Sequence, residues 1–283
     1  MTEYDYDLLV IGSGPGGQSA ALQAASLGKR VGLVERKPYL GGVSLQTGTI
    51  PSKALREAAY LASRFSSRGM RDAGQIRDHL HSGFLSEAVG RKQAVIDRHE
   101  RLLLNQLMSH GVTLLPGEAG FIDAHTLNLH NSNGEAVQLS AAVIVLATGS
   151  RPRRPADVPF DRERVLDSTS ILQMRRLPRR MTIIGGGVIA CEFATIFAPL
   201  GVAVSLVDSH DHLLAYLDED IQQTLEHDLL DTGVQLYMQT RIKQIERQGD
   251  RAVSYTHLRA HETALRISYA VFCLKKGGGG GGG

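Results

Sequence analysis

Two stretches of this chain share one pattern of apolar and polar positions. Residues 7–17 (DLLVIGSGPGG) place an apolar run before three glycines, and the helical run QSAALQAASLGK follows. Residues 181–192 (MTIIGGGVIACE) repeat this order, and FATIFAPLG continues as a helix. A short apolar run that ends at glycines is typical of a buried strand, whereas small and apolar residues at helical spacing indicate a helix. Each stretch therefore predicts a strand, a glycine turn and a helix.

The chain between these stretches predicts two helices and then several strands. Apolar residues recur at helical spacing in residues 52–67 (SKALREAAYLASRFSS) and 85–111 (LSEAVGRKQAVIDRHERLLLNQLMSHG). The segments VTLLPGEAGFI, HTLNLH, AVQLS and AAVIVLATG then predict strands, the last of them buried, with a turn at NSNGE. RPRRPADVPF, rich in Pro and Arg, predicts a solvated connection between a domain of residues 1–150 and a domain of residues 151–252.

Both glycine turns are followed by a second strand that ends in an acid. RVGLVE ends at Glu35 and AVSLVD ends at Asp208, each 23 residues after the first glycine of its turn. This is close to the spacing of about 20 in the dinucleotide-binding fingerprint. The chain therefore predicts an α/β fold with two Rossmann-like units. Their small residues are Gly12, Gly14 and Gly17 in the first unit and Gly185, Gly187 and Ala190 in the second.

Each residue of this fingerprint has a physical task. The first glycine allows a tight turn, the second lets the backbone approach a pyrophosphate, and the third allows helix and strand to pack closely. The helix N-terminus offers N–H groups and a partial positive charge to the phosphates. Glu35 and Asp208 would accept hydrogen bonds from ribose hydroxyls, and Asp208 would favour NAD(H) because an acid repels a 2′-phosphate. The alternative is two turns that need small residues for packing alone.

Length and composition exclude several classes of protein. A chain of 283 residues suggests about two domains, and 42% hydrophobic with 21% charged residues is ordinary for a soluble protein. No apolar run reaches the roughly 18 residues that span a bilayer. The acidic start MTEYDYD is unlike a signal peptide. We therefore expect a cytoplasmic protein without a membrane partner.

Residues 253–283 differ in character from the rest. Val253 to Thr263 resembles the translation of a transposase-type sequencing-library adapter, Ala264 to Arg266 would be the sample index, and Ile267 to Leu274 resembles the flow-cell primer sequence. Two lysines and seven glycines follow. We expect this segment to be a non-native tail with a disordered terminus, and we leave it out of the fold prediction.

Excluding that tail changes the charge. It contains Arg259, Arg266, Lys275 and Lys276 against Glu262, so the formal net charge falls from +2 to −1. The arginines near the domain connection have no interleaved aromatic residues, and we expect no nucleic-acid partner.

The motifs together suggest a family. Four motifs follow one another along the chain: the first fingerprint, the segment GGVSLQTGTIPSKALREA, the strand that ends at Ala147-Thr148-Gly149, and the second fingerprint GGGVIACE. This arrangement, which covers residues 4–252, resembles the FAD-dependent pyridine nucleotide disulfide oxidoreductases. The resemblance implies that the first unit binds FAD and the second binds a nicotinamide cofactor.

The chain departs from the family's redox motif. That motif is G-G-x-C-x-x-x-x-C-x-P-x-K, and Ser44 and Thr49 stand at its two cysteine positions. A hydroxyl cannot cycle through a disulfide, and Cys191 is the only cysteine before the tail. We therefore expect no reduction of lipoamide, glutathione or thioredoxin disulfides.

Within the family, the chain is most similar to the soluble, Si-specific pyridine nucleotide transhydrogenases. The segments that carry this similarity are GTIPSKALR, DSTSIL and HLLAYLDEDI. That subgroup moves hydride between NAD(H) and NADP(H) through FAD and needs no dithiol. Two alternatives stay open: an NAD(P)H:quinone or other acceptor reductase on the same scaffold, and a non-catalytic FAD-binding remnant.

The resemblance also implies roles for individual residues. Lys53 matches the lysine near flavin N5 and Glu192 the acid that pairs with it, so these are the candidate catalytic residues. The alternatives are a surface lysine and a carboxylate that the helix dipole favours. The remaining cofactor-binding positions are Arg36, Gly42, Ser44, Thr49, Ala119, Thr148, Gly149 and Ile242, the last against the adenine.

Other reactive side chains have simpler interpretations. We expect Cys191 to pack in the core. His210 and His212, in the segment DSHDHL, are expected to lie near the adenosine ribose or to face solvent. We assign no metal.

The family fold extends beyond the segments found here. It includes the rest of the nicotinamide domain, a returning stretch that completes the flavin site, and a C-terminal dimerisation domain. The resemblance therefore implies that this chain is a fragment of a homodimeric parent protein.

Overall fold

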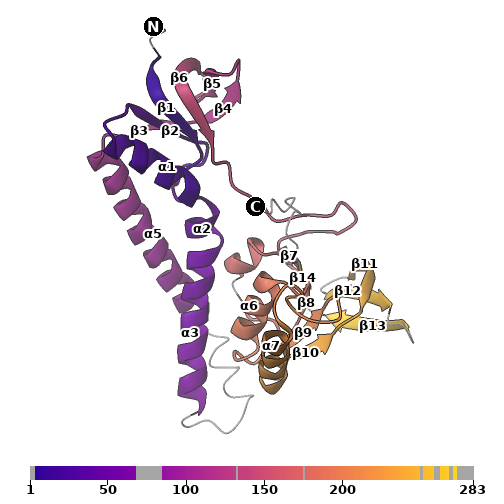
Figure 1. Cartoon of the computed structure of the whole chain (residues 1–283). Helices are drawn as coiled ribbons and strands as arrows, with labels where there is room; N and C mark the ends of the chain where they lie inside the picture. Colours follow the sequence, from indigo (N-terminus) through magenta and orange to yellow (C-terminus); the bar gives the residue numbers. More distant parts are fainter. Residues whose placement is uncertain are drawn as a thin grey trace. The chain divides into compact units, whose positions relative to one another are not determined.

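The chain forms two compact units in the computed structural model (Figure 1). The structure describes residues 4–67, 85–131, 133–174, 176–248, 251–257, 262–267 and 270–272. One unit comprises Met1–Pro51 and Gln93–Ser150, and the other comprises Ser52–Lys92 and Arg151–Gly283. One boundary between these units falls at residue 150, and the expected domain ranges stay a prediction. Residues 52–92, which we expected in the first domain, group with the second unit instead.

The first unit contains a six-stranded sheet in the order β3-β2-β1-β6-β5-β4 (Figure 1). Its strands are β1 (Tyr6–Ile11), β2 (Val31–Glu35), β3 (Thr113–Pro116), β4 (Glu118–Phe121), β5 (Thr126–His130) and β6 (Ala136–Leu146). β1 is parallel to β2 and β6, and β2 is parallel to β3, whereas β5 is antiparallel to β4 and β6. The loops after β1, β2 and β6 therefore meet at one edge, where ligands bind in such sheets.

Both faces of β1 are buried, which explains its short continuous apolar run. Val10 packs on one face with Ala21 and Leu107, which lie on α1 (Pro15–Ser26) and α5 (Leu85–Ser109). Leu9 packs on the other face with Leu127 of β5. The two helices predicted between the glycine turns are α3 (Thr49–Ser67) and α5, and the short helix α2 (Gly42–Gln46) precedes α3.

Strand β6 differs from the expectation in two ways. The segments AVQLS and AAVIVLATG form one continuous strand, because the ladder with β5 leads directly into the ladder with β1. The expected burial of the second segment is wrong: of residues 141–146 only Ala141 is buried, and Val143 is 54% and Leu146 is 64% exposed.

The second unit contains a five-stranded parallel sheet in the order β10-β9-β8-β14-β7. Its strands are β7 (Val165–Asp167), β8 (Arg180–Ile184), β9 (Ala203–Val207), β10 (Gln235–Tyr237) and β14 (Ala270–Phe272). Helix α6 (Val188–Phe197) follows β8, and α7 (Glu219–Asp231) precedes β10. The 3-10 turn η2 (Ser170–Gln173) follows β7. Both units show the predicted order of strand, glycine turn and helix, so the predicted α/β fold is confirmed.

The core of this unit lies between α6 and its sheet. Phe193 and Phe197 of α6 have ring centroids 6.2 Å apart, and both belong to a buried cluster with Met181 and Ile183 of β8. Leu55 of α3 joins the same cluster. This apolar packing positions the glycine turn between β8 and α6.

The residues that we expect to be a foreign tail contribute strands. β11 (Arg241–Gln248), β12 (Arg251–His257) and β13 (Glu262–Ile267) form an antiparallel sheet, and β14 pairs with β7 and β8. Strands pair through backbone hydrogen bonds, so a non-native segment can also pair if its sequence favours strands. The origin of residues 253–283 as a non-native tail therefore stays a prediction. The seven terminal glycines lie outside the described residues.

Candidate nucleotide-binding site

Two positions of the turn after β1 have room only for glycine. Gly12 has a φ of +107°, and a Cβ there would lie 2.3 Å from the carbonyl oxygen of Ala147. A Cβ on Gly17 would lie 1.9 Å from the carbonyl oxygen of Gly12. Both distances are far below van der Waals contact, so the turn, α1 and the end of β6 pack through bare backbone.

One side of this turn is open. Gly14 is the N-cap residue of α1, no side chain caps the helix there, and a Cβ on Gly14 would meet nothing within 4 Å. Gly42 approaches the turn closely, because a Cβ on it would lie 2.8 Å from the Cα of Gly14. The first N–H groups of a helix lack intrahelical partners and carry a partial positive charge. The arrangement suits an anionic group such as a pyrophosphate.

Ser13 fixes the carboxylate of Glu35 beside this turn. The backbone N–H and the hydroxyl of Ser13 donate to Oε2 of Glu35 at 3.0 and 2.6 Å. The N–H of Lys37 donates to Oε1 at 2.9 Å. The buried Ser13 Oγ also accepts from the N–H of Gly41 at 3.1 Å. Oε1 of Glu35 keeps a lone pair for a further donor, such as a ribose hydroxyl.

The other predicted positions of the first unit surround this turn unevenly. Thr148 follows β6, and its Cα would lie 3.4 Å from a Cβ on Gly12. Gly149 comes next, with a φ of +68°. Arg36 pairs with Glu118 at 3.7 Å on the surface. Three further positions lie on other elements of this part of the chain: Ser44 on α2, Thr49 at the start of α3 and Ala119 on β4.

The second glycine turn repeats the first. Gly185 has a φ of +106°, and Gly187 is the N-cap residue of α6, where a Cβ would meet nothing within 4 Å. Ala190 is fully buried on the first turn of α6. The N–H of Gly186 donates to Oδ2 of Asp208, which follows β9. The donor and the acid are 22 positions apart, the same separation as Ser13 and Glu35.

Asp208 contacts the residue two positions after it, as Glu35 contacts Lys37, but here the side chain takes part as well as the backbone. The N–H of His210 donates to Oδ1 of Asp208 at 2.7 Å, and Nδ1 of the same residue lies 2.5 Å from Oδ1. The side chain of Asp208 is 10% exposed and that of His210 is 68% exposed. His210 therefore lies beside the acid with most of its side chain exposed to solvent.

Lys53 and Glu192 form an ion pair within the second unit. Nζ of Lys53, on α3, lies 2.7 Å from Oε1 of Glu192, on α6. The hydroxyl of Ser52 donates to the same oxygen at 3.2 Å. The lysine side chain is 57% exposed and the glutamate 18%, so the carboxylate is the more buried partner of the pair.

Two other predicted residues lie in apolar surroundings. Ile242 of β11 packs against a cluster that includes Val165 and Ile245. Cys191 is buried on α6, as expected, and its Sγ lies 3.8 Å from the carbonyl oxygen of Gly186. Burial raises the pKa of the Cys191 thiol to about 11, so at neutral pH it is not a reactive thiolate.

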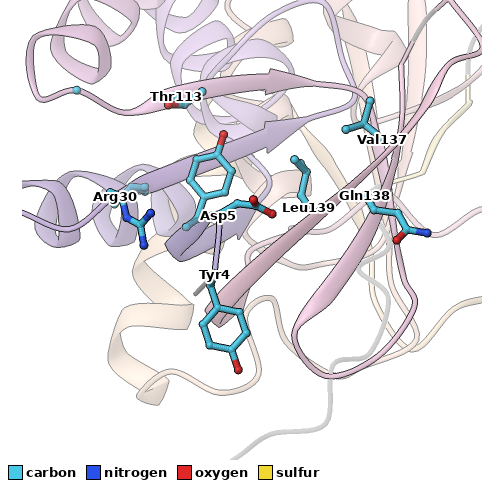
Figure 2. Close-up of a pocket in the computed structure, with 10 residues that line it drawn as sticks. Tyr4, Asp5, Arg30, Thr113, Val137, Gln138 and Leu139 are labelled. Carbon is cyan, nitrogen blue, oxygen red and sulfur yellow. The ribbon is translucent and has the colours of Figure 1, made fainter. Parts of the chain in front are cut away.

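A separate cavity of about 840 Å³ lies in the first unit, at the start of β1 and β2 (Figure 2). Its lining includes Tyr4, Asp5, Arg30 and Leu139. These residues lie near the amino ends of the parallel strands, whereas the glycine turn lies at their carboxyl ends. The cavity contains no predicted site residue.

Two residues of the turns, Ser13 and Gly186, were missed by the sequence prediction. Ser13 and Gly186 occupy the variable position between the first two glycines, where the fingerprint specifies no residue type. Their N–H groups nevertheless fix the two carboxylates. His210 was expected near the adenosine ribose or facing solvent, but its contact with the carboxylate of Asp208 was not predicted. Its position two residues after the acid was the available signal.

Two other kinds of site are absent from the described residues. None of their helices is both long and apolar enough to cross a bilayer. They contain no group of three or more His, Cys, Asp or Glu side chains that could hold a metal ion.

Known proteins match this chain over most of its length. The family model described as pyridine nucleotide-disulphide oxidoreductase matches residues 6–274. A soluble pyridine nucleotide transhydrogenase of Mycobacterium bovis is 42% identical over 232 residues, which cover 81% of this chain and 49% of the relative. The one from Colwellia psychrerythraea is 37% identical over 258 residues, 91% of this chain and 54% of the relative. The chain thus spans about half the length of these curated relatives.

Solved structures match the fold. LpdA from Mycobacterium tuberculosis superimposes with a TM-score of 0.81 at 26% identity, over 94% of this chain and 57% of that one. RclA, an HOCl-induced flavoprotein disulfide reductase from Escherichia coli, gives a TM-score of 0.77 at 25% identity, over 94% of this chain and 56% of that one. With the family model covering nearly all of the chain, this protein belongs to the pyridine nucleotide-disulphide oxidoreductase family.

Proposed function

We propose that this chain carries the FAD and nicotinamide sites of a soluble enzyme that transfers hydride between NAD(H) and NADP(H). The observation that supports this most is the duplicated glycine turn. Each turn has an open N-cap glycine, Gly14 or Gly187, and an acid held by the turn's own backbone, Glu35 or Asp208. One nucleotide at each turn is the minimum that a flavin-mediated hydride transfer requires.

The first turn fits the adenosine diphosphate half of FAD. Gly14 and Gly42 leave bare backbone beside the N-terminus of α1, where a pyrophosphate would find N–H donors. Oε1 of Glu35 would accept from a ribose hydroxyl. When bound, FAD would accept a hydride from one nicotinamide nucleotide and donate it to another.

The second turn fits a nicotinamide dinucleotide in the same way. Gly187 leaves the N-terminus of α6 open, and the buried Ala190 keeps the helix close to β8. Asp208 would accept from the adenosine ribose.

Lys53 and Glu192 are the residues that we assign to the reaction. A positive charge near flavin N5 favours the reduced, anionic ring. Glu192 would restrain the lysine through the 2.7 Å ion pair and limit its loss of solvation.

Ser44 and Thr49 argue against disulfide chemistry in this protein. They occupy the positions that hold the redox cysteines in the family pattern, and Cys191 is buried. A reduced flavin would therefore have no redox disulfide at these positions to reduce.

The proposal is tested by purifying the protein and measuring its flavin. Purified protein should be yellow, release FAD on denaturation, and lose its flavin absorbance when NADH or NADPH is added without oxygen. Steady-state turnover should be faster with an oxidised nicotinamide than with a quinone as acceptor. Bound flavin that neither nucleotide bleaches would instead indicate a non-catalytic remnant, and faster quinone reduction would indicate an acceptor reductase.

A further inference from the structure

The two acids at the glycine turns differ in one neighbour. Among the described residues, the carboxylate of Glu35 accepts from the N–H and the hydroxyl of Ser13 and from the N–H of Lys37, and it forms no ion pair. Asp208 accepts from the N–H of Gly186 and also contacts the imidazole of His210. Both carboxylates also accept from two backbone N–H groups, so the imidazole of His210 takes the place that the hydroxyl of Ser13 has at the first turn.

This imidazole occupies the second lone pair of one carboxylate oxygen of Asp208. Each carboxylate oxygen has two lone pairs. Oδ1 of Asp208 accepts from both the backbone N–H and Nδ1 of His210, at 2.7 and 2.5 Å. Because a carboxylate only accepts, Nδ1 carries the proton in this contact. Only Oδ2, which accepts from Gly186, keeps a lone pair for a ribose hydroxyl.

We propose that His210 is a specificity-determining residue that allows the second turn to bind both NAD(H) and NADP(H). By occupying Oδ1, the ring weakens the bonds of Asp208 to the ribose of NAD(H). It also places an N–H donor against the negative charge that would repel a 2′-phosphate. The ring is 68% exposed, so its other nitrogen stays accessible to a ligand. This inference rests on the proposed nicotinamide site.

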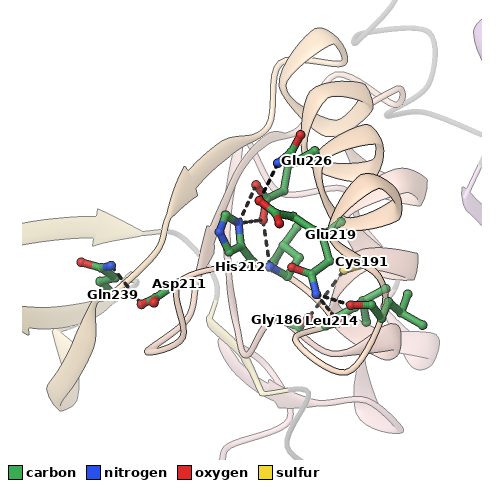
Figure 3. A network of polar contacts seen from close by, with 12 residues as sticks. Gly186, Cys191, Asp211, His212, Leu214, Glu219, Glu226 and Gln239 are labelled. Atoms are coloured by element: carbon green, nitrogen blue, oxygen red, sulfur yellow. Dashed lines mark hydrogen bonds and ion pairs between the residues drawn. The ribbon is translucent and has the colours of Figure 1, made fainter.

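The other charged groups of this loop have partners of their own (Figure 3). His212 contacts the two carboxylate oxygens of Glu226 at 3.3 and 3.4 Å. Asp211 accepts from the side-chain amide of Gln239 at 2.9 Å. His212 is therefore a matched control: it is a histidine of the same loop that contacts a different acid.

The experiment measures Kd for NAD+ and NADP+ by calorimetry on the purified full chain, so that the readout is binding and not turnover. In His210→Ala, the ratio Kd(NADP+)/Kd(NAD+) should rise about fivefold, the upper range for an exposed pair of polar side chains. His210→Asn, whose amide can still donate to Oδ1, should return the ratio toward the original value. His212→Ala should leave the ratio within about twofold. In an Asp208→Asn background, the effect of His210→Ala should disappear.

The outcomes separate this inference from the proposed function. An unchanged ratio in His210→Ala, or an equal rise in His212→Ala, would overturn the role of His210 while leaving the nicotinamide site intact. If the original chain bound neither nucleotide, both proposals would be wrong. Thermal unfolding of each variant shows whether it is folded. If His210→Ala does not fold, His210→Asn tests the proposal in its place.

Discussion

Gly17 lies so close to Gly12 that a Cβ on Gly17 would stand 1.9 Å from the carbonyl oxygen of Gly12. The contact joins the third glycine of the fingerprint to the first. It allows α1 to start against the end of β1, which leaves the helix N-terminus beside the open Gly14. The proposed pyrophosphate site depends on this contact.

Gly17→Ala should therefore lose FAD. The added methyl group has only backbone around it, so α1 must move, and we expect a loss of about 1–3 kcal/mol in the free energy of unfolding. Flavin content after purification and urea unfolding would measure both effects. Gly16→Ala is the matched control, because a Cβ on Gly16 meets nothing within 4 Å, and it should keep FAD. Equal flavin content in the two variants would contradict the assigned role of Gly17.

Lys53→Met should slow reduction of the flavin by about tenfold or more, because it removes a positive charge that we place near the ring. Stopped-flow bleaching by NADH measures this rate. The free energy of unfolding should fall by less than about 1 kcal/mol, since the lysine is 57% exposed and such pairs contribute little. Lys29→Met, at an exposed lysine after α1, is the control. A bleaching rate equal to that of the control would show that Lys53 has no part in the reaction.

Asp167→Asn should reduce stability at neutral pH and lose its effect in acid. Burial raises the pKa of Asp167. The N–H of Ser170 and the guanidinium of Arg154 together lower it by more than burial raises it, so the pKa lies below the ordinary value of 3.8. A group with a lowered pKa stabilises the fold above its unfolded pKa, and this contribution is lost as the pH falls through the folded pKa. Asp167→Asn should therefore lower the free energy of unfolding by about 2 kcal/mol at pH 7. This difference should disappear below the folded pKa of Asp167.

Urea unfolding of Asp167→Asn at several pH values tests this prediction. Asp157→Asn, at an exposed position, should change stability by less than about 0.5 kcal/mol. A difference that stayed constant down to acid pH would show that the charge of Asp167 is not what stabilises the turn after β7.

The origin of residues 253–283 is tested on the gene. If the segment YTHLRAHET is a translated adapter, sequencing independently amplified DNA should replace everything after about Arg251 with different codons. Finding the same segment again would make β12, β13 and β14 parts of the native protein.

The glycine turns were predictable because their chemistry is local. The φ of +107° at Gly12 and the close packing at Gly17 need glycine wherever this turn occurs, so the spacing of glycines and acid is enough to find it. The meeting of Lys53 with Glu192 came from the family resemblance, because 139 positions separate them and no local pattern connects them.

The remaining features depend on tertiary contacts. The grouping of residues 52–92 with the second unit depends on contacts such as that of Leu55 with the cluster around Phe193, which helical spacing cannot reveal. The exposure of Val143 was missed because an apolar run shows a preference for burial without showing what covers it. The pairing of His210 with Asp208 depends on a loop conformation that two neighbouring histidines do not specify.

The most direct test of the central claim is hydride transfer between the two nicotinamides. NADPH is supplied as donor and the thionicotinamide analogue of NAD+ as acceptor, and the reduced analogue is followed by its distinct absorbance. We predict reduction that requires FAD and is slowed in Lys53→Met. Flavin that NADPH bleaches, with no reduced analogue formed while quinones or disulfides are consumed, would contradict the assignment as a transhydrogenase.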